Sequence, residues 1–116
     1  MERHLSKRVE WYLSECFRRG ATPRVTEFTH ISRISRFAAS RAARRVFGRT
    51  LRDLFHHRQV VEAQRALERG LTTEAAARSA GFTSPSTFFR TFRKYTGTTP
   101  AAFAHKVAVD HQIGRR

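Results

Sequence analysis

Apolar side chains recur along the chain at the spacing of an α-helix. The first segment shows this most clearly, because its apolar residues return every three or four positions and so share one face of a helix. These residues are Leu5, Val9, Tyr12, Leu13, Cys16 and Phe17. The pattern predicts a helix over residues 3–19 with one buried face. No segment shows the sustained alternation, bounded by hairpin turns, that is typical of β-strands.

Glycine and threonine divide the rest of the chain into further helices. A glycine is followed two residues later by threonine four times, at Gly20, Gly48, Gly70 and Gly97. Glycine adopts the left-handed conformation that ends a helix at little cost, and threonine caps the next helix by accepting hydrogen bonds from its free N–H groups. Each proline follows Ser or Thr, as expected in a first helical turn; these are Pro23, Pro85 and Pro100.

These helix-ending and helix-capping residues predict an all-α fold of about seven helices. The remaining six are expected over residues 23–31, 35–47, 51–69, 73–80, 85–96 and 100–109. The helix over residues 51–69 is expected to be anchored in the core by Leu51, Leu54, Phe55 and Leu67.

Two of the expected helices repeat one arrangement of cations. Arg41, Arg44, Arg45 and Gly48 recur 49 positions later as Arg90, Arg93, Lys94 and Gly97. Each basic helix follows a short helix and a tight turn, which is the order of a helix-turn-helix unit, whose second helix lies in the DNA major groove. The helix over residues 51–69 would join the units with a span on the order of 28 Å. One turn of B-DNA measures about 34 Å, so the two basic helices could enter successive major grooves.

The predicted organisation therefore has four parts. Residues 1–49 form an N-terminal helix and a first helix-turn-helix unit, and residues 50–70 form the linker helix. Residues 71–110 form the second unit, and residues 111–116 form a basic tail.

Charge points to a polyanionic partner. The 116 residues carry a formal net charge of +14, and no acidic residue lies between residues 28 and 52 or between residues 75 and 109. Those two windows contain the repeated basic helices. Ten phenylalanines accompany the cations, whereas a disordered basic tail would be poor in aromatic residues. The composition therefore favours folded, cationic helices that bind nucleic acid or another polyanion.

The second half resembles the DNA-binding region of AraC/XylS-type transcription regulators. The family signature is a Gly-Phe turn, a recognition helix of the form S-x-F-x-R-x-F-K/R-K-x-x-G, and then x-x-P with an aromatic residue. The sequence "AGFTSPSTFFRTFRKYTGTTPAAF", residues 80–103, matches it. The resemblance covers about residues 25–103 and is looser in the first half. Arg33 stands at a turn position that is usually glycine, and Ala39 and Ala43 stand where the family has large side chains, which predicts a thinly packed first unit.

The resemblance implies two DNA-binding helices and assigns their residues. The candidates for contact with bases or the major groove are Arg36, Phe37, Ser40, Arg41, Ser86, Thr87 and Arg90. The candidates for contact with phosphates are Arg44, Arg45, Ser84, Arg93 and Lys94. The four cations among them lie at the C-terminal ends of their helices, where a positive charge also suits the helix dipole. Phe37 is open to two interpretations, local packing or an apolar contact with a thymine methyl group, whereas Phe88 and Phe92 are expected in the core.

Other classes of function find little support. The histidines form no i, i+4 pair and the single cysteine, Cys16, lies on an apolar stripe, so neither a metal site nor any other cofactor is expected. The acids are too scattered for acid/base catalysis, and no apolar run is long enough to span a membrane. We therefore expect a non-enzymatic cytoplasmic protein associated with the nucleoid. The family usually adds a sensor domain, for which these 116 residues leave no room.

Three interpretations remain open at this point. The first is a sequence-specific regulator that binds double-stranded DNA as a monomer, with RNA polymerase as a further candidate partner. The second is a sequence-tolerant architectural protein that binds DNA or RNA through its charge. The third is a DNA-targeting subunit of a partner sensor or enzyme, suggested by Trp11, which lies off the main apolar stripe of the first helix.

Overall fold

The computed structural model describes residues 2–114, which fold into seven α-helices without a strand. The helices are α1 (Glu2–Arg19), α2 (Val25–Ser32), α3 (Arg36–Phe47), α4 (Leu51–Glu68), α5 (Thr73–Ser79), α6 (Pro85–Thr96) and α7 (Pro100–Gly114). The predicted all-α fold is confirmed, and most helix ends lie within two residues of their predicted positions. Helix α7 continues to Gly114 instead of ending near residue 109. Residues 115 and 116 of the predicted basic tail lie outside the described residues.

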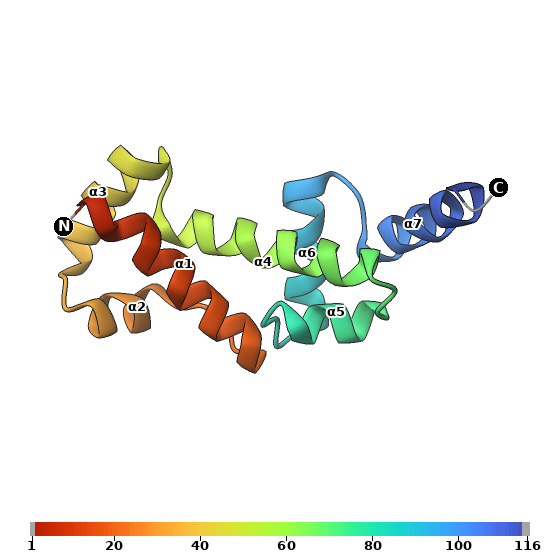
Figure 1. The fold of residues 1–116 in the computed structure, drawn as a ribbon, viewed down its shortest axis with the longest axis horizontal. Helices are drawn as coiled ribbons and strands as arrows, with labels where there is room; N and C mark the ends of the chain where they lie inside the picture. Colours follow the sequence, from red (N-terminus) through yellow and green to blue (C-terminus); the bar gives the residue numbers. More distant parts are fainter. Residues whose placement is uncertain (1, 115–116) are drawn as a thin grey trace.

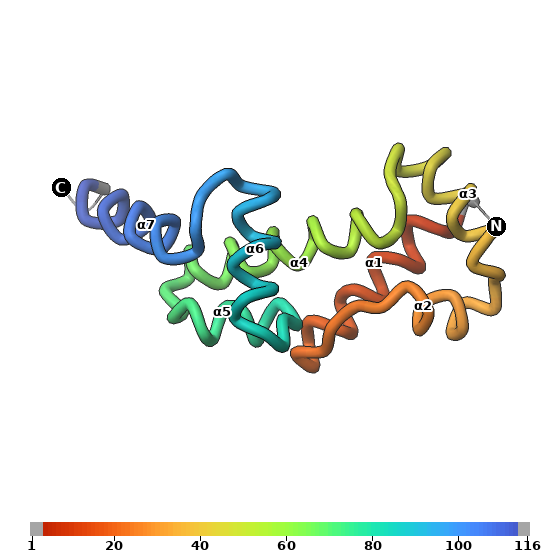
Figure 2. The backbone as a smooth tube through the Cα atoms, turned by 180° about the vertical axis from the view of Figure 1, so that it is seen from behind, coloured from red at the N-terminus to blue at the C-terminus, as the bar shows by residue number. Residues whose placement is uncertain are grey.

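The molecule is elongated, and α4 runs along its length (Figure 1). Its principal extents are 51 × 26 × 23 Å. Helices α1, α2 and α3 lie around the first half of α4, and α5 and α6 lie beside its second half, whereas α7 starts near the end of α4 and extends beyond it (Figures 1 and 2). The two helix-turn-helix units, α2–α3 and α5–α6, therefore lie at different positions along one continuous helix.

Each half has its own core, and α4 contributes to both. Leu51 and Phe55 join the core built from α1, α2 and α3. Val60, Ala63, Ala66 and Leu67 join the core built from α5, α6 and α7. Of the four anchors expected on this helix, Leu51, Phe55 and Leu67 are buried, whereas Leu54 is only partly buried. Because one rigid helix is packed into both cores, it couples the two units mechanically.

Helix α1 fills the space that small side chains leave in the first unit. Ala39 and Ala43 of α3 are fully buried although they stand where larger residues were expected. Helix α1 packs directly on α3, and Leu5 and Val9 enter the same core. The small side chains of α3 are thus shielded from solvent, because α1 approaches a helix face made of alanines.

The turn between α1 and α2 differs from the sequence prediction. Thr22 was expected to cap the second helix and Pro23 to lie in its first turn, but α2 begins at Val25, and Arg24 occupies the cap position without a capping side chain. Instead, the Thr22 hydroxyl donates a hydrogen bond to the backbone carbonyl of Gly81, in the turn between α5 and α6. The Thr22 cap prediction was wrong because this contact between the halves takes the hydroxyl that would have capped α2.

Gly81 lies against the same turn. Its φ is +80°, and a Cβ atom added there would overlap the backbone of Ala21. The two turns touch where α1 ends beside α5 (Figures 1 and 2). This close approach holds the first helix-turn-helix unit against the second, independently of α4.

Candidate nucleic-acid interface

Helix α3 exposes the cations that the sequence predicted as DNA contacts. Ser35 caps its start by accepting a hydrogen bond from the N–H of Ala38 at 3.0 Å, and Gly48 ends it at φ 71°. The alanine face is buried, which turns the opposite face to solvent. That face carries the exposed side chains of Arg36, Phe37, Ser40, Arg41, Arg44 and Arg45.

Phe37 is the most exposed large apolar side chain of the described residues, at 72%. The guanidinium of Arg41 lies 4.8 Å from the centroid of its ring. A cation over an aromatic face is attracted to it, so each side chain helps to orient the other. The structure thus places Phe37 on the surface beside a candidate base-reading arginine and outside the hydrophobic core.

Helix α6 repeats this arrangement. Ser84 caps its start by accepting from the N–H of Thr87 at 3.3 Å, and Pro85 occupies its first turn. Phe88 and Phe92 are buried, as predicted. The candidates Ser86, Thr87, Arg90, Arg93 and Lys94 are exposed, whereas Ser84 is partly buried. Phe89, which sequence analysis did not single out, is 44% exposed and lies among them.

Both helices concentrate positive charge. Neither α3 nor α6 contains an acidic residue, so no carboxylate within either helix offsets its arginines. Their last turns hold Arg44 and Arg45 in α3, and Arg93 and Lys94 in α6. Cations gathered on an exposed helix face create the positive potential that attracts phosphates.

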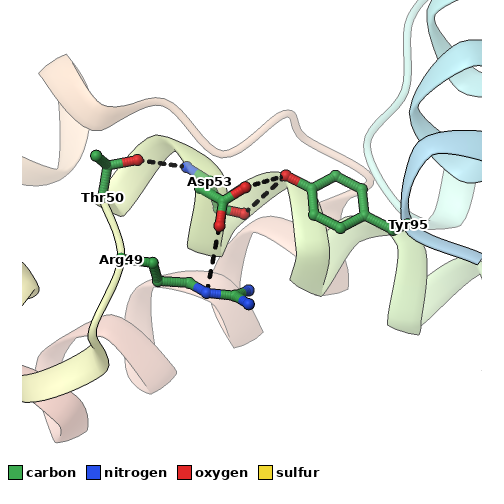
Figure 3. Close-up of polar contacts among 4 residues, drawn as sticks. All are labelled: Arg49, Thr50, Asp53 and Tyr95. Carbon is green, nitrogen blue, oxygen red and sulfur yellow. Dashed lines mark hydrogen bonds and ion pairs between the residues drawn. The ribbon is translucent and has the colours of Figure 1, made fainter.

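A polar link joins the ends of the two basic helices (Figure 3). Arg49, directly after the last turn of α3, lies 3.2 Å from the Asp53 carboxylate. The Tyr95 hydroxyl, at the end of α6, donates to the same carboxylate. Asp53 also donates its N–H to the Thr50 hydroxyl at 3.0 Å, which caps α4. The carboxylate therefore connects the C-terminal ends of α3 and α6 through the start of α4.

The ionisation of these groups follows from the link. The hydrogen bond from Tyr95 is the main reason that the pKa of Asp53 is lowered, and Arg49 lowers it further. Burial, followed by the hydrogen bond to Asp53, raises the pKa of Tyr95 to about 12. The tyrosine thus stays a neutral donor and the aspartate a charged acceptor over the physiological pH range. The threonine cap could be predicted from the sequence, but the partner of Asp53 could not, because it lies 42 residues away.

The part of the chain that the structure describes offers no cluster of side chains for metal binding. Within residues 2–114, His, Cys, Asp and Glu side chains do not meet in a group of three that could hold a metal ion. Cys16 is buried, and burial raises the pKa of its thiol. Among the same residues, no helix has both the length and the apolar character needed to cross a membrane.

Comparisons with known proteins agree with this arrangement. A protein-family model described as a helix-turn-helix domain matches residues 28–106. Among solved structures, the chain is similar to a protein of unknown function from Listeria innocua, with a TM-score of 0.74 and 21% identity. The alignment covers 85% of this chain and 93% of that one, so the two share a fold. No curated protein matches the chain.

Proposed function

The chain belongs to the AraC/XylS-type helix-turn-helix family, and from this premise we propose that it is a sequence-specific transcription regulator. The family is one of DNA-binding domains, not of enzymes. In the proposed complex, α3 and α6 enter successive major grooves of double-stranded DNA. Arg36, Ser40 and Arg41 meet one groove, and Thr87 and Arg90 meet the next.

The duplicated basic helix is the observation that carries the proposal. Two helices expose arginines at equivalent positions, Arg41 and Arg90, and both are free of acids. They lie at different places along α4, whose 18 residues span about 27 Å. This length is comparable with the roughly 34 Å between successive major grooves on one face of B-DNA. The length of α4 therefore supports the proposal that one chain presents two recognition helices to one duplex.

Selection of bound DNA from a random pool by the purified protein tests the proposal. We expect an enriched sequence with two parts whose centres lie about 10 bp apart. Arg90→Ala should cost about 1–3 kcal/mol on that sequence and relax the preference in one part only. Equal loss on every sequence would assign Arg90 to phosphate contact, and failure to enrich any sequence would favour the architectural alternative.

We propose that the protein binds its site as a monomer, because one chain supplies both recognition helices. RNA polymerase is the further partner that a DNA-bound regulator of this kind would contact. Sedimentation of the complex with a duplex carrying one selected site should give one protein chain per duplex. A ratio of two chains per site would contradict the monomeric assembly while leaving DNA binding intact.

A further inference from the structure

The two units contain equivalent grooves that differ in their chemistry. In each unit a groove lies where three helices begin: the first helix of the helix-turn-helix, its recognition helix, and the helix that follows. In the first unit these helices begin at Val25, Arg36 and Leu51, and in the second at Thr73, Pro85 and Pro100. The first groove has a volume of about 740 Å³ and the second about 420 Å³.

The first groove is lined by cations from three separate helix starts. Arg24 precedes α2, Arg36 opens α3, and Arg52 lies in the first turn of α4. All three side chains are exposed, and no Asp or Glu lines this groove. Thr26 and Ser40 also line it, and their hydroxyls are the kind that donate to phosphate oxygens. This combination of forked guanidinium groups and hydroxyls is suited to a phosphate group.

The second groove lacks these cations. Counted from the helix starts, the residues equivalent to Arg24, Arg36 and Arg52 are Thr72, Pro85 and Ala101, and of these Pro85 and Ala101 line the second groove. The Thr72 hydroxyl already caps α5 by accepting from the N–H of Ala75 at 3.1 Å. Glu74 lines this groove beside one cation, Arg78. The remaining lining includes the hydroxyl side chains of Thr73, Thr83, Ser84 and Thr99, but the larger part of it is apolar, with Phe82, Phe88 and Phe89.

The cationic groove opens beside the proposed recognition face. Arg36, Phe37 and Ser40 line it and also belong to the exposed face of α3. When a helix occupies a major groove, the sugar-phosphate strands that border the groove pass beside the helix. A strand bordering α3 would thus run past the arginines at the starts of α2 and α4.

We propose that the first groove binds a backbone phosphate of the DNA strand that borders α3, with Arg24 and Arg52 as its principal ligands. The second groove has no equivalent site, so the first unit carries the larger share of salt-dependent anchoring. The proposal rests on the proposed DNA-binding function and adds two residues, Arg24 and Arg52, that the family resemblance did not assign.

His56 provides an independent reporter inside this groove. It is partly buried, and burial, followed by Arg52 and Lys94, lowers its pKa. The charged and titratable groups that line the groove with it are Arg24, Arg36 and Arg52. Asp53, the one nearby acid that acts on His56, shifts its pKa in the opposite direction. A phosphate bound among these groups would raise the pKa of His56, because an added anion stabilises the imidazolium.

The salt dependence of binding tests the proposal with a matched control. Arg24→Gln combined with Arg52→Gln removes two charges from the groove. Arg65→Gln combined with Arg69→Gln removes two exposed charges near the end of α4, outside the groove. Each phosphate contact adds about 0.9 to the slope of log K against log salt. On one duplex carrying a selected site, the groove pair should lower the slope by about 1.5–2 and the control pair by less than about 0.5.

Several outcomes separate this inference from the proposed function. Equal slopes for the two double variants would overturn the phosphate site while leaving DNA binding intact, whereas absence of specific binding by the parent protein would overturn the proposed function itself. Ala101→Arg, which places a cation in the second groove, should raise the slope by up to about 0.9.

NMR titration of His56 distinguishes a phosphate of the DNA backbone from a free phosphate compound. We expect its pKa to rise on addition of the duplex and to stay unchanged with inorganic phosphate at matched ionic strength. A rise with inorganic phosphate and none with the duplex would assign the groove to a free phosphate compound and contradict the backbone site. A rise with neither would also contradict it.

Discussion

The two helix-turn-helix units reach the same architecture by different means. In the second unit, Phe88 and Phe92 of the recognition helix fill the core themselves. In the first unit, the recognition helix contributes alanines, and α1 supplies the missing volume through Leu5, Val9 and Leu13. The second unit therefore follows the family signature within its own sequence. The first unit depends on a helix outside the helix-turn-helix. Its own sequence therefore matches the family pattern only loosely, although its core residues are buried.

The two units also differ in the lining of their grooves and in the backbone of their turns. The groove of the first unit is lined by three arginines, whereas that of the second is lined mainly by apolar residues. The turn of the first unit places Arg33 at φ 57°, and the turn of the second places Gly81 at φ +80°. The first unit thus combines strong charge with a strained turn, and the second combines weaker charge in its groove with a relaxed one.

A substitution at the contact between the units is expected to have the largest effect on stability. Gly81→Ala adds a Cβ at positive φ and forces it against the backbone of Ala21. We expect a loss of about 2–4 kcal/mol in the free energy of unfolding, from the left-handed conformation and the overlap together. Gly97→Ala is the control, because Gly97 has φ +78° with no atom near the added Cβ, and it should cost only about 1–2 kcal/mol. Equal losses in urea denaturation would mean that the two turns are not tightly packed.

The alanine face of α3 distinguishes the two cores. Ala43→Leu restores the kind of large residue that the family has, but α1 already occupies the space. We expect a loss of about 1–3 kcal/mol through overpacking, measured by thermal or urea unfolding. Ala108→Leu, at an exposed position of α7, should change stability by less than about 0.5 kcal/mol. A stabilising effect of Ala43→Leu would show that the first core contains unfilled space.

A substitution in the turn of the first unit is expected to have the smallest effect on stability, and this effect is stabilising. Arg33 has a left-handed backbone at φ 57°, ψ 42°, which costs about 1–2 kcal/mol for a residue with a side chain. Arg33→Gly removes this cost but loses about 0.5–1 kcal/mol to the greater freedom of glycine in the unfolded chain. The expected net gain is about 0.5–1 kcal/mol, whereas Arg33→Lys should leave the melting temperature nearly unchanged. A lower melting temperature for Arg33→Gly would indicate that the arginine side chain itself stabilises the turn.

Local signals in the sequence were sufficient for most of the fold. Helix periodicity and the glycine–threonine pairs located all seven helices, since capping and left-handed termination are decided by residues near one another. Thr50 and Thr72 cap their helices as predicted. Thr22 does not, because its hydroxyl bonds to Gly81, 59 residues away. The exposed faces of α3 and α6 were also predictable, because burial of one helix face exposes the other.

Most of the features that sequence analysis missed depend on distant residues. The link from Asp53 to Tyr95 and the fit of α1 against the alanine face require the tertiary structure. Arg24 and Arg52 belong to no shared motif, and they come together in one groove only because the starts of α2 and α4 converge. Contact of the predicted site residues with DNA stays a prediction, which requires measurement on the complex.

Footprinting of the DNA complex tests the central claim, that both basic helices bind one face of a duplex. The parent protein should protect two segments about 10 bp apart. Arg41→Gln with Arg44→Gln should lose protection in one segment, and the equivalent pair Arg90→Gln with Arg93→Gln should lose it in the other. A single protected segment that is unaffected by the changes in α3 would contradict the account, because α6 alone would then bind the DNA.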